Sequence, residues 1–339
     1  MAEPPAARGV DPGVSATESI AVLREPSSRL LQPAHYGGRA VSRSASEAVD
    51  FVTAVAGLAE RDGSGGWSAA AVNAAAYTVA GLGDTAAERV WGADAGALVT
   101  AGREPTGRLT PDGANFRLTG QWESVTAALF ADWVLLSARE GDSVRCVLLP
   151  RDVVQVARQA GVRGLDSAGI GDVTASDTVI DAQAVFPYPD DSSCDTGDFD
   201  DAPPSCLVLD WAGQAAAVVG AAAGVWQAHV GQVRQRLATS YGSEDTTELT
   251  SSAVLVAKAE SDIDAARLQL VAALSADAPA AATALRQAVT RARNAADQLL
   301  SSGSRHALDA TDPVARLWFD VLAGYRLTIR SIGGDPSAG

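Results

Sequence analysis

The chain has 339 residues, of which 47% are hydrophobic, enough to form the cores of one to three domains. Its 41 acidic and 26 basic residues give a net charge of −15, which argues against nucleic-acid binding because phosphate contacts need clustered cations. The three His residues are scattered and the three Cys residues lack a CxxC spacing, which argues against a metal site. No uninterrupted run of about 18 apolar residues and no signal peptide occur, so we expect a cytoplasmic protein without membrane contact.

The N-terminal part predicts a short helical domain over residues 18–96 behind a disordered tail. Residues 1–17 are rich in Pro, Ala and Gly without periodicity, which is typical of such a tail. Ser44 or Ser46 and, further on, Asp84 are suited to cap helices, because their side-chain oxygens accept bonds from free backbone N–H groups. Helices are expected over residues 17–23, 46–61, 68–79 and 84–92.

Residues 97–210 predict a central β-domain, and the stretch 102–136 is its most informative part. Two turn signals, at residues 105–107 and 111–115, enclose short β-type segments. After the second turn, apolar residues alternate with polar ones as in a half-buried strand, at Phe116, Leu118 and Trp122. This pattern predicts a hairpin in a small antiparallel sheet. Further strands are expected over residues 131–136, 144–149 and 178–185.

Residues 211–332 predict a C-terminal bundle of four antiparallel helices. The apolar segment 212–225 is short and rich in Ala, so it indicates a buried helix rather than a membrane span. Apolar residues recur at helical spacing over residues 212–240, 250–274, 279–300 and 313–329. The whole chain is therefore expected to have an α+β fold.

Two features between the sheet and the bundle leave alternatives open. Residues 190–201 contain six Asp, which favours a solvated acidic loop over a Ca²⁺ loop because the EF-hand order of ligands is absent. Cys194 and Cys206 are able to close a loop, but free thiols are the favoured interpretation.

Several motifs, taken in order, resemble the acyl-CoA dehydrogenase superfamily. The resemblance is strongest to its two-component flavin-dependent monooxygenases, which are hydroxylases supplied with reduced flavin by a separate reductase. It extends over residues 30–330 and implies an N-terminal helical domain, a barrel-like antiparallel β-domain, a four-helix bundle, and a homotetramer or dimer. The motifs are LLQPAHYGG (30–38), DGSGGW (62–67), PTG (105–107), G-x-W (120–122), ADWVLL (131–136), GLDSAGIGDV (164–173) and DPVARLWFD (312–320).

The same resemblance implies a flavin site, for FAD or FMN, against the strand that carries Trp122. By position in the motifs, Ser124 and Thr126 would also contact the flavin, with Thr106 nearby. Arg305 stands where relatives often have Gly, and its guanidinium suits a phosphate. The expected substrate-pocket residues are Trp67, Asn73 and Tyr77.

The usual proton-handling residues of the superfamily are missing. Dehydrogenases need a carboxylate base within hydrogen-bond reach. No Asp or Glu lies between Asp210 and Glu244 or between Asp320 and Asp335, the two windows in which relatives carry it. The windows in which hydroxylase relatives carry His, residues 74–77 and 324–328, contain none. The remaining candidates for a catalytic residue are His306, Tyr77 and Arg326.

Three functions follow from these observations. The first is a monooxygenase-like flavin enzyme that acts on a small hydrophobic or aromatic substrate, with a flavin reductase as partner. The second is an acyl-CoA dehydrogenase-type protein with a displaced base, or one half of a heteromer. The third is a non-catalytic binding or assembly subunit that has kept the fold.

Overall fold

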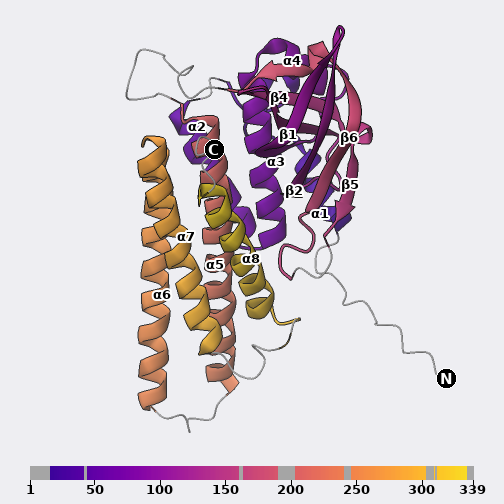
Figure 1. Cartoon of the computed structure of the whole chain (residues 1–339). Helices are drawn as coiled ribbons and strands as arrows, with labels where there is room; N and C mark the ends of the chain where they lie inside the picture. Colours follow the sequence, from indigo (N-terminus) through magenta and orange to yellow (C-terminus); the bar gives the residue numbers. More distant parts are fainter. Residues whose placement is uncertain are drawn as a thin grey trace, which may run out of the picture.

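The computed structural model describes residues 16–41, 44–159, 163–189, 203–239, 246–302, 309 and 311–333. Figure 1 shows a sheet on one side of the molecule, a bundle of long helices on the other, and helix α3 between them. The predicted tail up to residue 15, the acidic loop with Cys194, and both Arg305 and His306 lie outside the described residues. The domain boundaries given above therefore remain predictions.

The N-terminal helices follow the predicted periodicity, with three changes at their ends. They are α1 (Ala16–Arg24), α2 (Ala45–Ala59), α3 (Gly63–Gly81) and α4 (Asp84–Trp91). Ser44 caps α2, since its Oγ accepts the N–H of Glu47 at 3.3 Å. α1 begins inside the predicted tail, and α3 begins five residues early, so the glycine-rich motif is its first turn rather than a link. Asp84 is the first residue of α4, and Gly83 occupies the N-cap.

Seven strands form a single sheet in the order β5-β6-β2-β1-β3-β4-β7. All neighbouring pairs are antiparallel except β1 and β3, which are parallel, so the prediction of a purely antiparallel sheet is wrong at this pair. The strands are β1 (Val99–Asp112), β2 (Asn115–Val125), β3 (Trp133–Glu140), β4 (Ser143–Pro150), β5 (Gln155–Arg158), β6 (Gly171–Asp181) and β7 (Val185–Pro187).

The two predicted turns of the central stretch have different outcomes. The turn at residues 111–115 is confirmed, since β1 pairs with β2 around it. The turn at 105–107 is wrong: these residues lie within β1, where the register with β3 shifts between Gly102 and Gly107. A shifted register bends a strand without ending it, so Pro and Gly are tolerated there. The predicted strand 178–185 is interrupted by a turn of 3-10 helix at Ala182–Ala184.

Trp122 fills the core of the sheet next to this bulge. Its side chain is only 1% exposed, and its indole Nε1 donates to the carbonyl of Ser137 at 2.9 Å. A methyl group on Gly107 would lie 2.4 Å from the indole ring, and one on Gly120 would lie 2.5 Å from Gly107 itself. The glycines of β1 and β2 therefore make room for the indole between the strands.

The C-terminal bundle is formed by four helices, as predicted. They are α5 (Cys206–Thr239), α6 (Thr246–Ala273), α7 (Ala278–Ser301) and α8 (Pro313–Gly333). Within the described residues, α5 is the one helix long and apolar enough to cross a membrane, but 83% of its apolar window is buried inside the protein. Ala and Val side chains of α5 pack against α2, α3, α7 and α8, so α5 is the core helix that joins the bundle to the N-terminal helices.

A junction at Gly164 connects the loop before β6 to α8. Gly164 has a φ of +86°, and a methyl group there would lie 2.2 Å from the carbonyl oxygen of Phe319. Next to it, the N–H of Leu165 donates to the Asp320 carboxylate at 2.5 Å. The loop continues to Ala168 and Gly169, whose carbonyls accept the N–H groups of Ala127 and Leu129. The loop before β6 therefore contacts both α8 and the segment that follows β2, and it links their positions.

Gly164→Ala is expected to lower the free energy of unfolding by about 3 kcal/mol, because it combines a left-handed φ with an overlap against backbone. Gly141→Ala is the matched control, since Gly141 also has a positive φ, +58°, but nothing lies within 4 Å of a methyl group there. It should cost only about 1 kcal/mol. Urea unfolding of both variants measures the difference, and equal losses would contradict the overlap at Phe319.

Candidate functional site

A cavity of about 650 Å³ lies where β1 and β2 meet helices α3, α5 and α8. This volume is within the range of small-molecule and cofactor sites. Apolar side chains form much of its wall, from Trp67 and Ala71 on α3, Leu207 and Trp211 on α5, and Leu327 on α8. The site therefore combines residues that are far apart in sequence and requires the sheet and the bundle together.

The end of β2 forms a strained part of this wall. Ser124 and Ala127 have φ values of +56° and +62°, which non-glycine residues rarely adopt. The Asp172 carboxylate holds this conformation by accepting the N–H of Ser124 at 2.9 Å, and Gln159 bonds to both Asp172 and the Ser124 hydroxyl. Such strain persists where the surroundings enforce it and concentrates at ligand sites.

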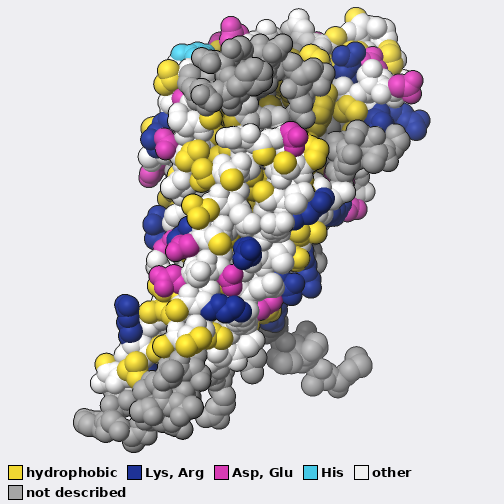
Figure 2. Space-filling view, turned by 90° about the vertical axis from the view of Figure 1, so that its left-hand side faces the viewer, with side chains coloured by type: hydrophobic (Ala, Val, Ile, Leu, Met, Phe, Trp, Pro, Cys, Tyr) yellow, Lys and Arg dark blue, Asp and Glu magenta, His cyan; other side chains and the backbone are white. Residues whose placement is uncertain are grey.

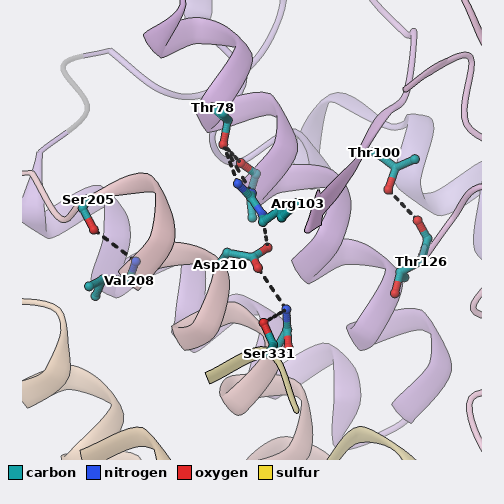
Figure 3. Close-up of polar contacts among 10 residues, drawn as sticks. Thr78, Thr100, Arg103, Thr126, Ser205, Val208, Asp210 and Ser331 are labelled. Carbon is teal, nitrogen blue, oxygen red and sulfur yellow. Dashed lines mark hydrogen bonds and ion pairs between the residues drawn. The ribbon is translucent and has the colours of Figure 1, made fainter. Parts of the chain in front are cut away.

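Thr126 lies between these two strained residues and lines the cavity. Its hydroxyl accepts the indole N–H of Trp67 at 2.9 Å, and its carbonyl accepts the hydroxyl of Thr100 at 2.5 Å. Figure 3 shows the second of these bonds, with Thr100 and Thr126 facing one another. The structure thus brings Trp67, Ser124 and Thr126, all predicted site residues, to the same cavity.

The other two predicted flavin contacts on the sheet lie at the same wall but are engaged elsewhere. Trp122 borders the cavity, yet its indole is buried in the core of the sheet. The Thr106 hydroxyl also borders the cavity and donates to the carbonyl of Gln121 at 2.6 Å. Trp122 therefore shapes the wall from beneath, whereas Thr106 lies at its exposed part with its hydroxyl proton engaged.

Three predicted residues do not line the cavity. Asn73 is 2% exposed, and its amide bonds to backbone groups of Leu31, Ser28 and Ala69, so it ties the N-terminal loop to α3. Tyr77 is 2% exposed, and its hydroxyl donates to the carbonyl of Pro204 at 2.9 Å. Arg326 lies on the exposed face of α8. The side chains of α8 that do reach the cavity are Leu327, Arg330 and Ser331.

The structure adds a buried ion pair that sequence reasoning missed. Arg103 Nε lies 3.1 Å from Asp210 Oδ1, with side chains that are 20% and 9% exposed, and both residues line the cavity. Arg103 Nη1 and Nη2 each lie 3.3 Å from the hydroxyl of Thr78. Gln214 donates to the other Asp210 oxygen at 3.0 Å (Figure 3). One signal was present in the sequence: a single Asp in an otherwise apolar helix needs a buried partner.

Tyr188 lies at the same polar end of the cavity. Burial raises the pKa of its hydroxyl, an effect that the Arg103 guanidinium opposes. The phenol therefore stays neutral at physiological pH and is able both to donate and to accept a hydrogen bond. Buried Cys146 lies close enough to feel the same guanidinium, but burial dominates and raises the pKa of its thiol to about 12.

The rim of the cavity carries an exposed charge cluster. Arg330 on α8 lies 3.5 Å from Glu104 on β1 and 3.4 Å from Glu123 on β2. Side chains that are 49%, 58% and 57% exposed make such contacts weak in water. The cluster bridges the sheet and the bundle but contributes little to stability.

Comparisons with known proteins agree with this architecture. Residues 212–328 match the family model "Acyl-CoA dehydrogenase, C-terminal domain". Over 321 residues the chain is 27% identical to the oxygenase subunit HsaA of a flavin-dependent monooxygenase from Rhodococcus jostii, which covers 87% of this chain and 82% of the relative.

Solved structures share the fold over nearly the whole chain. XiaF from Streptomyces, solved with FADH2 and glycerol, superposes with a TM-score of 0.80 at 20% identity and covers 95% of this chain and 89% of its own. Butyryl-CoA dehydrogenase from Megasphaera elsdenii superposes with a TM-score of 0.76 at 16% identity, covering 94% and 89%. The predicted α+β fold and the predicted resemblance are confirmed.

Proposed function

We propose that this chain, a divergent member of the acyl-CoA dehydrogenase superfamily, is a flavin-dependent monooxygenase that acts on a small hydrophobic or aromatic substrate. The observation that carries the proposal is the wall Ser124–Thr126, which lies between the strained residues Ser124 and Ala127, is held by Asp172, and faces a cavity of about 650 Å³. A wall enforced in this way presents hydroxyl and backbone groups in fixed positions to a ligand.

The residues present fit a flavin. The cavity has the volume of a cofactor site, and it joins a polar strand wall to apolar surfaces of Trp67 and Trp211. Thr126 and Ser124 would hold the ring system at its polar edge, and Trp67 would fix the Thr126 hydroxyl that faces it. A reduced flavin would supply the electrons for oxygen activation.

Relatives suggest the partner and the form of the cofactor. The Rhodococcus relative is named an oxygenase subunit, which supports a separate flavin reductase for this chain as well. Neighbouring structures contain FADH2 or FMN, so we infer a flavin and expect reduced FAD, as in XiaF, to bind more tightly than FMN. We also infer a cytoplasmic location, where reduced nicotinamides are available to a reductase.

A homotetramer is proposed for the assembly. Helix α6 exposes large apolar side chains, at Val254, Leu268 and Val271, with exposed fractions of 65%, 74% and 42%. Figure 2 shows hydrophobic side chains scattered among charged ones over this side of the bundle. Light scattering coupled to gel filtration measures the mass in solution, and a monomer would contradict the proposal.

A dehydrogenase with a displaced base is the second candidate, because Asp210 is a carboxylate within the cavity. Its carboxylate forms an ion pair with Arg103, and protonation of Asp210 would leave that guanidinium without a counter-ion, so Asp210 is a poor base toward carbon. Tight binding of oxidised FAD would favour this candidate. Absence of binding in either redox state would favour the non-catalytic subunit instead.

Thr126→Val is expected to weaken the binding of reduced FAD by about fivefold, since it removes one hydrogen-bonding group worth roughly 1 kcal/mol without changing shape. Trp67→Phe should give a similar loss, because it removes the indole N–H that orients the same hydroxyl. Anaerobic titration followed by tryptophan fluorescence measures both affinities. Thr110→Val is the control, since Thr110 is exposed on β1 and does not line the cavity. Unchanged affinity in both site variants would refute this position for the flavin.

A further inference from the structure

The polar end of the cavity lies opposite a largely apolar body, and its donors and acceptors are only partly used. Arg103 has five N–H groups, of which three are engaged by Asp210 and Thr78. The other two have no acceptor among the residues that the structure describes. Figure 3 shows the guanidinium between Thr78 on α3 and Asp210 on α5, so that both helices fix its orientation.

Asp210 also keeps spare capacity. Its two oxygens accept one bond each, from Arg103 and from Gln214, whereas a carboxylate accepts about four. Gln214 is itself positioned by a 3.5 Å contact with Ser331 on α8. Within the described part of the chain the Tyr188 hydroxyl has no hydrogen-bond partner, so it too is open to a ligand in the cavity.

The charges of this end decide which polar group fits it. Arg103 and Asp210 form a neutral pair, so a substrate anion would meet the Asp210 carboxylate and a substrate cation would meet the guanidinium. A neutral hydroxyl suits both partners, because its O–H donates to Asp210 while its oxygen accepts from Arg103 or Tyr188. Its apolar body would lie against Trp67, Leu207 and Trp211.

We propose that Arg103, Asp210 and Tyr188 form the substrate-specificity subsite of this cavity, and that it binds a neutral hydroxyl group on an otherwise hydrophobic molecule. The proposal rests on the proposed function for the place of the subsite beside a flavin. The binding preference itself follows from the ion pair. Arg103 and Asp210 are the charged groups of this end, and Tyr188 and Gln214 lie beside them at the cavity.

Three bicyclic probes that differ in one substituent test the preference: naphthalene, 2-naphthol and 2-naphthoate. Equilibrium dialysis against the full chain, with and without reduced FAD, gives their affinities. We expect 2-naphthol to bind wild type about tenfold or more tightly than naphthalene, and 2-naphthoate to bind no better than naphthalene. Equal binding of 2-naphthol and naphthalene, or no binding of any probe at millimolar concentration, would overturn the proposal.

Asp210→Asn tests the role of the ion pair directly, because it should change the order of the probe affinities. It leaves the Arg103 charge without a counter-ion, so the preference should change from 2-naphthol to 2-naphthoate by about tenfold. Glu123→Gln is the matched control, because it removes a carboxylate at the exposed rim and should leave the order of the probes unchanged. An unchanged order in Asp210→Asn would refute the subsite.

A second variant covers the case in which Asp210→Asn folds poorly. Arg103→Met/Asp210→Leu removes both charges with little change in volume and should abolish the advantage of 2-naphthol over naphthalene. Flavin titration of the same proteins separates the two proposals. A double variant that keeps the advantage of 2-naphthol, or a wild type that lacks it, contradicts the subsite even if flavin binding is intact. Absence of flavin binding in a wild type that shows the preference contradicts only the proposed function.

Discussion

Asp210→Ala is expected to lower the free energy of unfolding by about 3–5 kcal/mol, one of the largest effects of any substitution in this chain. The Arg103 side chain is 20% exposed and its Nε bonds to Asp210 at 3.1 Å. Removal of the carboxylate leaves the guanidinium in a poorly solvated place, with Thr78 as its remaining described partner. Urea unfolding followed by circular dichroism measures the loss.

The double variant Arg103→Met/Asp210→Leu is the informative companion of this experiment. Replacing both members of a buried pair by apolar residues of similar size is often neutral or stabilising. We therefore expect it to recover most of the stability that Asp210→Ala loses. Asp264→Ala is the control, since Asp264 is 62% exposed and its contact with Arg267 contributes little. A double variant as unstable as Asp210→Ala would show that the pair stabilises the fold through more than its charges.

The bundle and the hairpin could be predicted from the sequence because both depend on local periodicity. The apolar spacing of α7 and α8 and the turn before Asn115 each lie within one segment of the chain. The parallel pairing of β1 with β3 could not be predicted in this way, since it brings together strands that are separated by β2. The turn predicted at Pro105 and Gly107 was wrong because these residue types occur in bulges as well as in turns, and the sequence does not distinguish the two.

The sequence predicted several residues that line the cavity, namely Trp67, Ser124 and Thr126, but not its buried ion pair, Arg103 with Asp210. Ser124 and Thr126 follow from a motif that is continuous in sequence, and the structure finds both at the cavity. Arg103 and Asp210 both fall within the predicted β-domain, residues 97–210, but Asp210 lies on helix α5, and the pair forms only where the start of α5 lies beside β1. Asn73 and Tyr77 lie on α3 as predicted, but helical phase turns them toward backbone partners instead of the cavity.

The ionisation of Asp320 is expected to affect the stability of the fold. Its carboxylate is 8% exposed and accepts the N–H of Leu165 at 2.5 Å. Burial raises its pKa from 3.8 to about 7; the Leu165 N–H and Arg316 oppose this rise, while Asp62 and Asp166 add to it. A methyl group on Gly63 would lie 2.6 Å from the carboxylate, so the first turn of α3 closes the site on that side.

The raised pKa makes stability depend on pH in a direction opposite to that of a salt-bridged Asp. The unfolded chain loses the Asp320 proton near pH 3.8, whereas the folded chain keeps it until about pH 7. Stability from this group is therefore complete below pH 3.8 and declines as the pH rises to about 7. A difference of about 3 pH units corresponds to roughly 4 kcal/mol, which is an upper limit because the pocket is able to relax.

Asp320→Asn is expected to remove this decline. The amide oxygen still accepts the Leu165 N–H, but the side chain no longer titrates. Measured by urea unfolding at several pH values, the stability of the variant relative to wild type should rise between pH 4 and pH 8 by up to about 4 kcal/mol. Asp264→Asn, at an exposed position of α6, should follow wild type throughout. If Asp320→Asn also runs parallel to wild type across this range, Asp320 titrates normally and the junction of α8 with the Gly164 loop does not depend on its proton.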